Sequence, residues 1–240
     1  MLMRMLAGGL IAGFGAGLFA AVLHFAFVQE LILRAELYET GELVHFGTGA
    51  GGDETVAISD NGHDHSHGDA DGADSSTLAR NVMTMLFTGL IYAGYGLVLA
   101  SAYQVAGLFG RQISLQQGIL WGIAGFASFQ LAPAMGLAPE LPGTTAADIA
   151  LRQIWWLGTV LATGAGLALI GYGRSLPFVI GGVALLALPH VIGAPMLEGF
   201  HGIAPPELAG EFSARVLGVG LAVWALLGWL TARFAAPEAA

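Results

Sequence analysis

The sequence predicts an all-α protein, a polytopic transmembrane helical bundle with five or six spans. Of its 240 residues, 55% are hydrophobic and only 10% are charged, and the mean hydropathy is +0.71. Ordinary soluble domains carry about 25% charged residues. The 37 glycines fit helices that pack closely in lipid, because small residues let backbones approach one another. The bilayer is therefore the expected solvent of most of the chain.

Six apolar stretches are long enough, or nearly so, to cross the hydrocarbon core, which takes about 20 helical residues. They run from Met5 to Val28, Arg80 to Tyr103, Leu115 to Leu137, Arg152 to Tyr172, Leu176 to Met196 and Phe212 to Phe234. The first is too long for a signal peptide and has no clear small-residue cleavage site, so we expect it to be retained. The fifth contains three prolines, which free backbone carbonyls. It is therefore either a broken span or a re-entrant segment.

These stretches divide the chain into three parts: a first span (1–28), a long loop (29–79) and the remaining bundle (80–240). The loop begins with QELILRAELYETGELVHFG, where apolar and charged residues alternate as in an amphipathic helix lying on a membrane. From Gly47 to Ser76 it is rich in Gly, Asp, Ser and His with few apolar residues. Such a composition predicts disorder.

A weak internal repeat suggests a bundle built from repeated helical hairpins. Arg111 and Arg174 each follow a glycine, and each precedes an apolar helix that ends in a proline-containing turn. Repeated units of this kind are common in transporters.

The charges predict an orientation. Arginines divide evenly between the two sides, but all of the 17 carboxylates except Glu238 fall on the side of the loops after spans one, three and five. The opposite side has short loops that carry only Arg111 and Arg174. We expect a multi-pass protein of the inner (plasma) membrane, with both termini in the cytoplasm and the acidic side facing outward.

The composition excludes several kinds of site. The chain has no cysteine, which rules out disulfides, thiolate metal sites and iron–sulfur clusters. It also has no lysine, and its formal net charge is -9. This balance argues against a nucleic-acid partner and leaves cations and membrane lipids as expected partners.

The strongest local signal for metal binding is a run of three histidines, His63, His65 and His67, in the acidic loop. Imidazoles and carboxylates in a flexible segment can wrap a first-row divalent cation. The alternative is a polar spacer without a ligand. A flexible run concentrates metal but does not select it.

Selection requires an ordered site, for which the sequence offers candidates near the outer ends of the spans. They are His24, His190, His201 and Glu198. Ionisable groups at membrane depth are costly and commonly face a pathway or a partner. The alternative interpretation is that each histidine hydrogen-bonds across a helix interface.

Arginines at the outer ends of spans are interpreted structurally. Arg152 with the two tryptophans that follow it resembles an interfacial anchor. Ion pairs are also expected there, between Arg80, Arg152 or Arg215 and Glu140, Asp148 or Glu211.

No phosphate-binding loop, serine elbow, HExxH or dinucleotide fingerprint is present, so we predict that the protein is not an enzyme and holds no tightly bound cofactor. Two alternatives remain open. One is a membrane scaffold or sensor that binds metal without moving it. The other is a membrane enzyme that acts on a lipid-like substrate through its outer carboxylates.

Two motifs resemble those of a known family. LAPELPGTTAADIALRQIWW (137–156) and LPHVIGAP (188–195), with the glycine-rich first span and the histidine-rich loop, resemble the CbtA family of proposed cobalt transporter subunits. The resemblance extends over the whole chain. It implies cobalt as the transported ion, a link to cobalamin synthesis, and a small single-span, histidine-containing partner of the CbtB type. The family is usually described with five spans, against the six stretches counted above.

Overall fold

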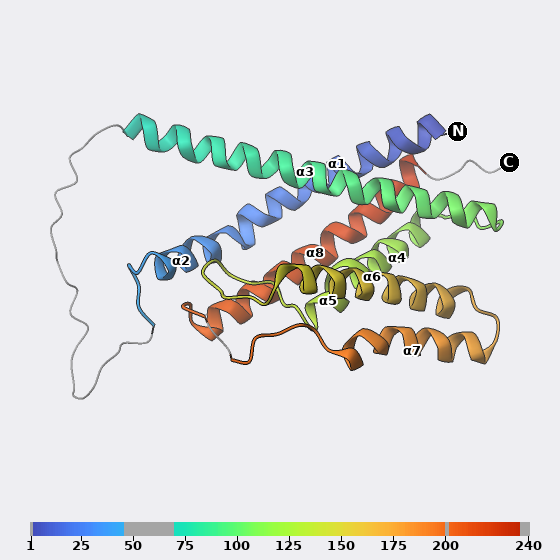
Figure 1. The fold of residues 1–240 in the computed structure, drawn as a ribbon. Coiled ribbons are helices and arrows are strands. Elements are labelled where there is room, and N and C mark those ends of the chain that lie inside the picture. The colour runs from blue at the N-terminus through green and yellow to red at the C-terminus, as the bar shows by residue number, and fades with distance from the viewer. Residues whose placement is uncertain (1, 46–69, 200–201, 236–240) are drawn as a thin grey trace.

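The computed structural model describes residues 2–45, 70–199 and 202–235, with the backbone alone for 70–76. All regular structure in these ranges is helical, as predicted (Figure 1). In chain order the elements are α1 (Leu2–Phe27), α2 (Gln29–Glu39), α3 (Ala70–Leu108), α4 (Leu115–Phe126), the π-helix η1 (Ala127–Leu131), α5 (Ala132–Ala134), α6 (Ile149–Tyr172), α7 (Leu176–Ile192) and α8 (Pro206–Phe234).

In the described part of the chain, four helices are long and apolar enough to cross a membrane by length and composition: α1, α3, α6 and α8. The apolar helix α7 is shorter, with 17 residues. The expected third span is divided into α4, η1 and α5, which follow one another without a gap from Leu115 to Ala134. The predicted all-helical membrane bundle is therefore confirmed in its helices and its four long spans.

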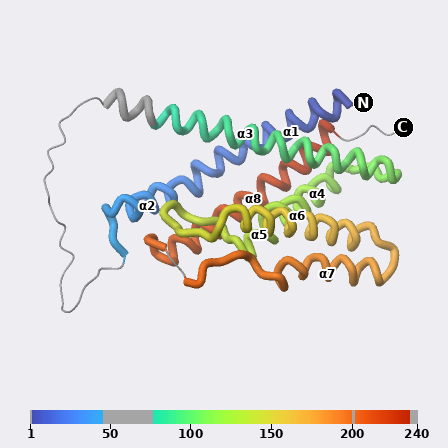
Figure 2. The backbone as a smooth tube through the Cα atoms, in the orientation of Figure 1, coloured from blue at the N-terminus to red at the C-terminus, as the bar shows by residue number. Residues whose placement is uncertain are grey.

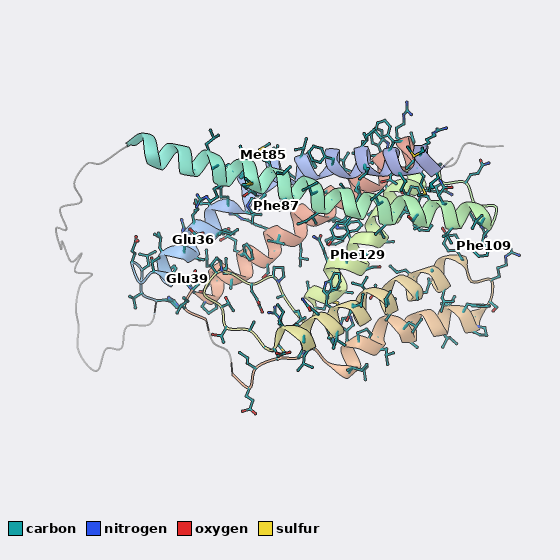
Figure 3. All side chains as sticks on the ribbon, turned by 45° about the horizontal axis from the view of Figure 1, so that its top comes forward. Glu36, Glu39, Met85, Phe87, Phe109 and Phe129 are labelled. Carbon is teal, nitrogen blue, oxygen red and sulfur yellow. The ribbon has the colours of Figure 1, made fainter. Side chains whose placement is uncertain are left out.

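The two ends of the bundle differ in character. The start of α1, the end of α8 and the α3–α4 and α6–α7 turns lie at one end, here called the terminal side (Figure 1). The opposite end, here called the acidic side, contains α2 and the segments that join α5 to α6 and α7 to α8. Glu36 and Glu39 lie at the acidic side, whereas Phe109 lies at the terminal side (Figure 3). Helix α1 therefore begins, and helix α8 ends, at the same end of the bundle.

Helices α1 and α3 contact each other through glycine and alanine. A Cβ on Gly13 would lie 2.3 Å from the Tyr92 carbonyl oxygen, and one on Gly17 would lie 2.6 Å from the Gly89 Cα. These distances are far below van der Waals contact, so the two backbones touch directly. The glycine-rich first span is therefore an interface with α3 as well as a membrane span.

Helices α4 and α8 form a second close pair. A Cβ on Gly122 would lie 2.1 Å from the Trp224 carbonyl oxygen, and one on Gly228 would lie 2.1 Å from the Gly118 carbonyl oxygen. The buried Tyr103 hydroxyl of α3 lies 3.0 Å from the Gly228 carbonyl oxygen and donates a hydrogen bond to it. This hydrogen bond ties α3 to the α4–α8 pair.

The α6–α7 hairpin stands apart from this four-helix core (Figure 2). Among the helices, α7 packs against α6 alone, while α6 also reaches η1, α5 and, slightly, α4. The Trp155 indole donates a hydrogen bond of 3.2 Å to the Pro189 carbonyl and so joins the two members of the hairpin. Two sequential pairs, α1–α3 and α6–α7, do form hairpins. The close pairs α4–α8 and α1–α8 join helices that are distant in the chain, which differs from the expected repeat.

The segment after the first span is helical, as predicted, and α2 is more buried than a surface helix. Leu31 and Ala35 of α2 join Leu141, Leu208 and Phe212 in one buried cluster. Helix α2 therefore packs on the start of α8 as well as facing solvent.

The segment predicted to be disordered, Gly47 to Ser76, overlaps the start of α3. Helix α3 begins at Ala70, so residues 70–76, expected to be disordered, are helical. The rest of that prediction falls on residues 46–69, which lie outside the described residues.

The glycine contacts predict a specific stability effect. We expect Gly13→Ala to lower the free energy of unfolding by about 1–3 kcal/mol, because its methyl group would force α1 away from the α3 backbone. Thermal unfolding in detergent, followed by near-UV circular dichroism, measures this effect. The matched control is Gly94→Ala in the middle of α3, where an added Cβ meets nothing within 4 Å. Equal melting temperatures for the two variants would contradict the proposed backbone contact.

Candidate functional site

A chamber of about 580 Å³ opens within the acidic side. We call it the acidic-side chamber. Its walls come from the α5–α6 segment (134–147), from Arg152, from the α7–α8 segment and from the first residues of α8. The first quoted motif, 137–156, supplies much of this lining, and the second, 188–195, reaches the cavity through Pro195.

Local sequence explains how these walls are held. Gly136 lies against Trp155 and Ala194, because a Cβ on it would be 2.6 Å from the indole ring and 2.8 Å from the Ala194 methyl group. Gly143 has φ +76°, a left-handed conformation that favours glycine, and it turns the chain back toward α6. The Asp148 carboxylate accepts hydrogen bonds from the backbone amides of residues 150 and 151 and so caps α6.

An ion pair lies in the chamber wall. An Nη of Arg152 donates to Glu140 at 2.8 Å, and the two side chains are 26% and 36% exposed. Arg215 pairs with Glu211 and also donates to the Phe27 carbonyl at 2.9 Å. Two of the predicted arginine–carboxylate pairs are therefore confirmed, while Asp148 serves as a helix cap.

The structure does not bring the predicted histidines together. His24 is half-buried in α1 beside Phe25, and His190 is half-buried in α7 with its ring 6.2 Å from that of Trp155. Helices α1 and α7 make no contact with each other. A single site that uses both side chains is therefore not formed in this conformation.

The remaining candidate ligands are placed as follows. Glu198 is exposed in the α7–α8 segment, next to the chamber residues Leu197 and Gly199. His63, His65, His67 and His201 lie outside the described residues. Within the described ranges, no three histidine or acidic side chains are grouped so that they could hold a metal ion.

The chamber offers a different donor set. Its lining includes the Glu140 carboxylate, the hydroxyls of Thr144 and Thr145, and the thioethers of Met135 and Met196. Carboxylate and hydroxyl oxygens suit hard divalent cations, and thioether sulfur is a softer ligand. Sequence analysis placed Glu140 near the outer ends of the spans. It missed the threonines, whose only signal was their place inside the first quoted motif.

Buried polar atoms lie deeper in the bundle, around η1. Within the described residues, Gln130 Oε1, Thr163 Oγ1 and Trp224 Nε1 are buried without a hydrogen-bond partner. Gln130 belongs to η1, and π-helical turns are frequent at functional sites. Burial of an unpaired polar atom is costly, so these three atoms are candidates for contact with a polar ligand.

Comparison with known proteins decides the family. Residues 2–236 match the family described as "Probable cobalt transporter subunit (CbtA)". The chain belongs to the CbtA family. No curated protein and no solved structure matches it. The family match covers nearly the whole chain, so it includes the acidic-side chamber, the deeper polar atoms and the four long spans of this CbtA protein.

The chamber ion pair is expected to contribute little to stability. In a double-mutant cycle with Glu140→Gln and Arg152→Gln, we expect a coupling free energy of about 0.2–1 kcal/mol, because solvent screens this partly exposed pair. Thermal unfolding of the four proteins measures it. The matched control is the Glu30–Arg34 pair, which is longer at 3.5 Å and 76% and 55% exposed, and it should show no measurable coupling. A coupling above about 2 kcal/mol would show that Glu140 has mainly a structural role.

Proposed function

We propose that this CbtA protein is the membrane subunit of a divalent metal uptake system that carries cobalt for cobalamin synthesis. The observation that carries the proposal is the family match over residues 2–236 of a chain with four long apolar spans. Cobalt is the transported ion rather than a resident cofactor. The protein is proposed to have no enzymatic activity and no tightly bound cofactor.

We further propose six membrane crossings. The start of α1 and the end of α8 lie at the same end of the bundle, which supports an even number of crossings (Figure 1). The four long helices, the short α7 and the continuous α4–η1–α5 stretch together supply that number. With the termini in the cytoplasm of the inner (plasma) membrane, the acidic side faces outward and receives the metal.

The acidic side can concentrate a cation before transport. The proposed collector is the histidine-rich loop with His63, His65 and His67, and its flanking carboxylates raise the local cation concentration. Inward movement of a divalent ion at 100 mV is favourable by about 4.6 kcal/mol. The membrane potential alone can therefore drive uptake.

Selection is assigned to the acidic-side chamber. In the structure the Arg152 guanidinium forms an ion pair with the Glu140 carboxylate. An entering cation would therefore compete with the guanidinium for that carboxylate. Such an exchange keeps the carboxylate paired both with and without metal, which limits the cost of an unpaired charge. Thioether and threonine oxygen donors around Glu140 supply further ligands. The unpaired atoms of Gln130 and Thr163 then offer polar contacts on the way inward.

The uptake system is proposed to include a second chain, a small single-span protein with its own histidine motif of the CbtB type. The family resemblance supports this partner. Assays of transport are therefore best made with the partner coexpressed.

Removal of the chamber charge should impair uptake. We expect Glu140→Gln to raise the cobalt concentration for half-maximal uptake by at least about tenfold, because the neutral amide is a weaker ligand. Uptake of radioactive cobalt into metal-starved cells measures this, with nickel and zinc as competitors. The matched control is Glu207→Gln, which removes an exposed carboxylate on the same side outside the chamber. Equal loss in both variants would indicate only a general effect of surface charge.

Loss of the histidine run should have a different signature. Replacement of His63, His65 and His67 by alanine is expected to raise the half-maximal concentration while leaving the maximal rate unchanged, because a collector affects supply rather than passage. The same cobalt uptake assay, over a range of concentrations, separates the two parameters. A lower maximal rate would instead place these histidines on the transport path. Cobalt binding without uptake, despite confirmed insertion of both chains, would favour the scaffold or sensor function.

A further inference from the structure

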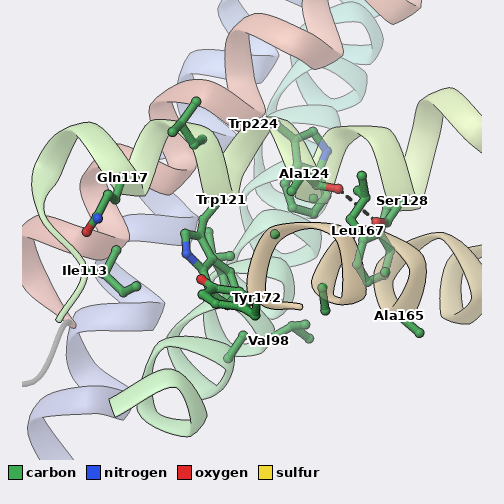
Figure 4. A pocket seen from close by; sticks show the side chains of 18 of the residues that line it. Val98, Ile113, Gln117, Trp121, Ala124, Ser128, Ala165, Leu167, Tyr172 and Trp224 are labelled. Atoms are coloured by element: carbon green, nitrogen blue, oxygen red, sulfur yellow. Dashed lines mark hydrogen bonds between the residues drawn. The ribbon is translucent and has the colours of Figure 1, made fainter. Parts of the chain in front are cut away.

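A second and larger cavity, of about 750 Å³, lies between α3, α4 and α6 (Figure 4). We call it the terminal-side cleft. It extends from Ser128 and Phe129, near η1, to Arg111 and Tyr172 at the terminal side. It exists because α6 contacts the four-helix core mainly through η1 and α5 and only slightly through α4.

The cleft is open on the face that meets the membrane. Val98 of α3, Leu120 of α4 and Leu161 of α6 line it and are 52%, 65% and 64% exposed. Val98 and Leu161 belong to α3 and α6, two of the helices that are long and apolar enough to cross a membrane. In a bilayer the opening would therefore face acyl chains.

The walls of the cleft are apolar along most of its length, and its polar side chains gather at the terminal-side end. Gln112 and Gln117 lie there beside Arg111. The Arg111 guanidinium carbon is 5.6 Å from the centre of the Tyr172 ring, and within the described residues Arg111 makes no ion pair. The cleft thus combines an apolar interior with a cationic mouth.

This arrangement does not suit a metal pathway. A divalent cation would pass an apolar wall without ligands and then meet a guanidinium at the mouth, which repels it. The cleft is also a poor site for water, since its walls offer few polar partners. An occupant must instead be apolar along its length and anionic at one end.

We propose that the terminal-side cleft binds one anionic phospholipid, with an acyl chain between α4 and α6 and its phosphate beside Arg111.

A tryptophan and a tyrosine favour this occupant over a helix of another protein. The Trp121 ring of α4 lies 6.1 Å from the Tyr172 ring of α6, so the two rings narrow the cleft at its terminal-side end. A helix with side chains is about 10–12 Å wide and would not pass between them. An acyl chain is thinner than a helix and can lie along the apolar walls of the cleft beside these rings.

Native mass spectrometry of the protein in a neutral detergent tests the proposal. The full chain is titrated with phosphatidylglycerol or with phosphatidylcholine of the same acyl chains, and bound lipid is counted. We expect one phosphatidylglycerol to bind with at least about a fivefold preference, which one interfacial arginine can supply. Arg111→Gln should abolish the preference while leaving some binding. The matched control, Arg233→Gln, removes a terminal-side cation outside the cleft and should behave like the wild type.

A second variant tests the apolar part of the site. Ala168→Trp fills the cleft from α6 and should weaken binding of both lipids. Ala187→Trp places the same side chain on an exposed position of α7 outside the cleft and should have no effect. Added inorganic phosphate should not compete, because it lacks the acyl chain.

The proposal would be overturned by equal binding of the two lipids to the wild type, by displacement with inorganic phosphate, or by unchanged binding in both Arg111→Gln and Ala168→Trp. Capture of a hydrophobic single-span peptide in place of lipid would assign the cleft to a helix partner instead. The assay requires no cobalt, so its outcome is independent of the uptake proposal.

Discussion

Direct backbone contact at glycine determines how the core of this membrane protein packs. Lipid acyl chains are as apolar as the side chains, so the hydrophobic effect does not drive helices together inside a bilayer. Helices there associate through close packing and hydrogen bonds. Gly13 and Gly17 bring α1 onto α3, while Gly118, Gly122 and Gly228 bring α4 onto α8. The Tyr103 hydroxyl links the two pairs through the Gly228 carbonyl. These contacts produce a rigid four-helix core.

The loose attachment of the α6–α7 hairpin follows from the same constraint. Its helices pack closely on each other, for example where Gly166 meets Gly182, but they contact the core mainly at η1 and α5. Two cavities result. The acidic-side chamber lies between the η1–α5 contact and the acidic side. The terminal-side cleft lies between the same contact and the terminal side.

The two cavities differ in chemistry because they meet different surroundings. The chamber is bounded by loop segments at the acidic end, where hydroxyl, carboxylate and thioether groups can remain solvated until a ligand arrives. The cleft is bounded by apolar helices. In a bilayer, polar groups on such walls would lose their hydrogen bonds to water, so apolar walls have the lower free energy. A metal site is therefore proposed for the first and a lipid site for the second. Of the residues with unpaired polar atoms, Trp224 lines the cleft.

Much of this protein could be predicted from the sequence, because the cost of placing a residue in lipid depends mainly on that residue. The apolar stretches predicted the helices, the carboxylates predicted an acidic side, and alternating charge predicted α2. Only the tertiary structure decided which helices face one another. It paired α4 with α8, placed His24 and His190 on helices that do not touch, and brought the α7–α8 segment beside the α5–α6 segment that carries Glu140. These outcomes depend on shape complementarity between segments far apart in the chain, which periodicity and composition do not encode.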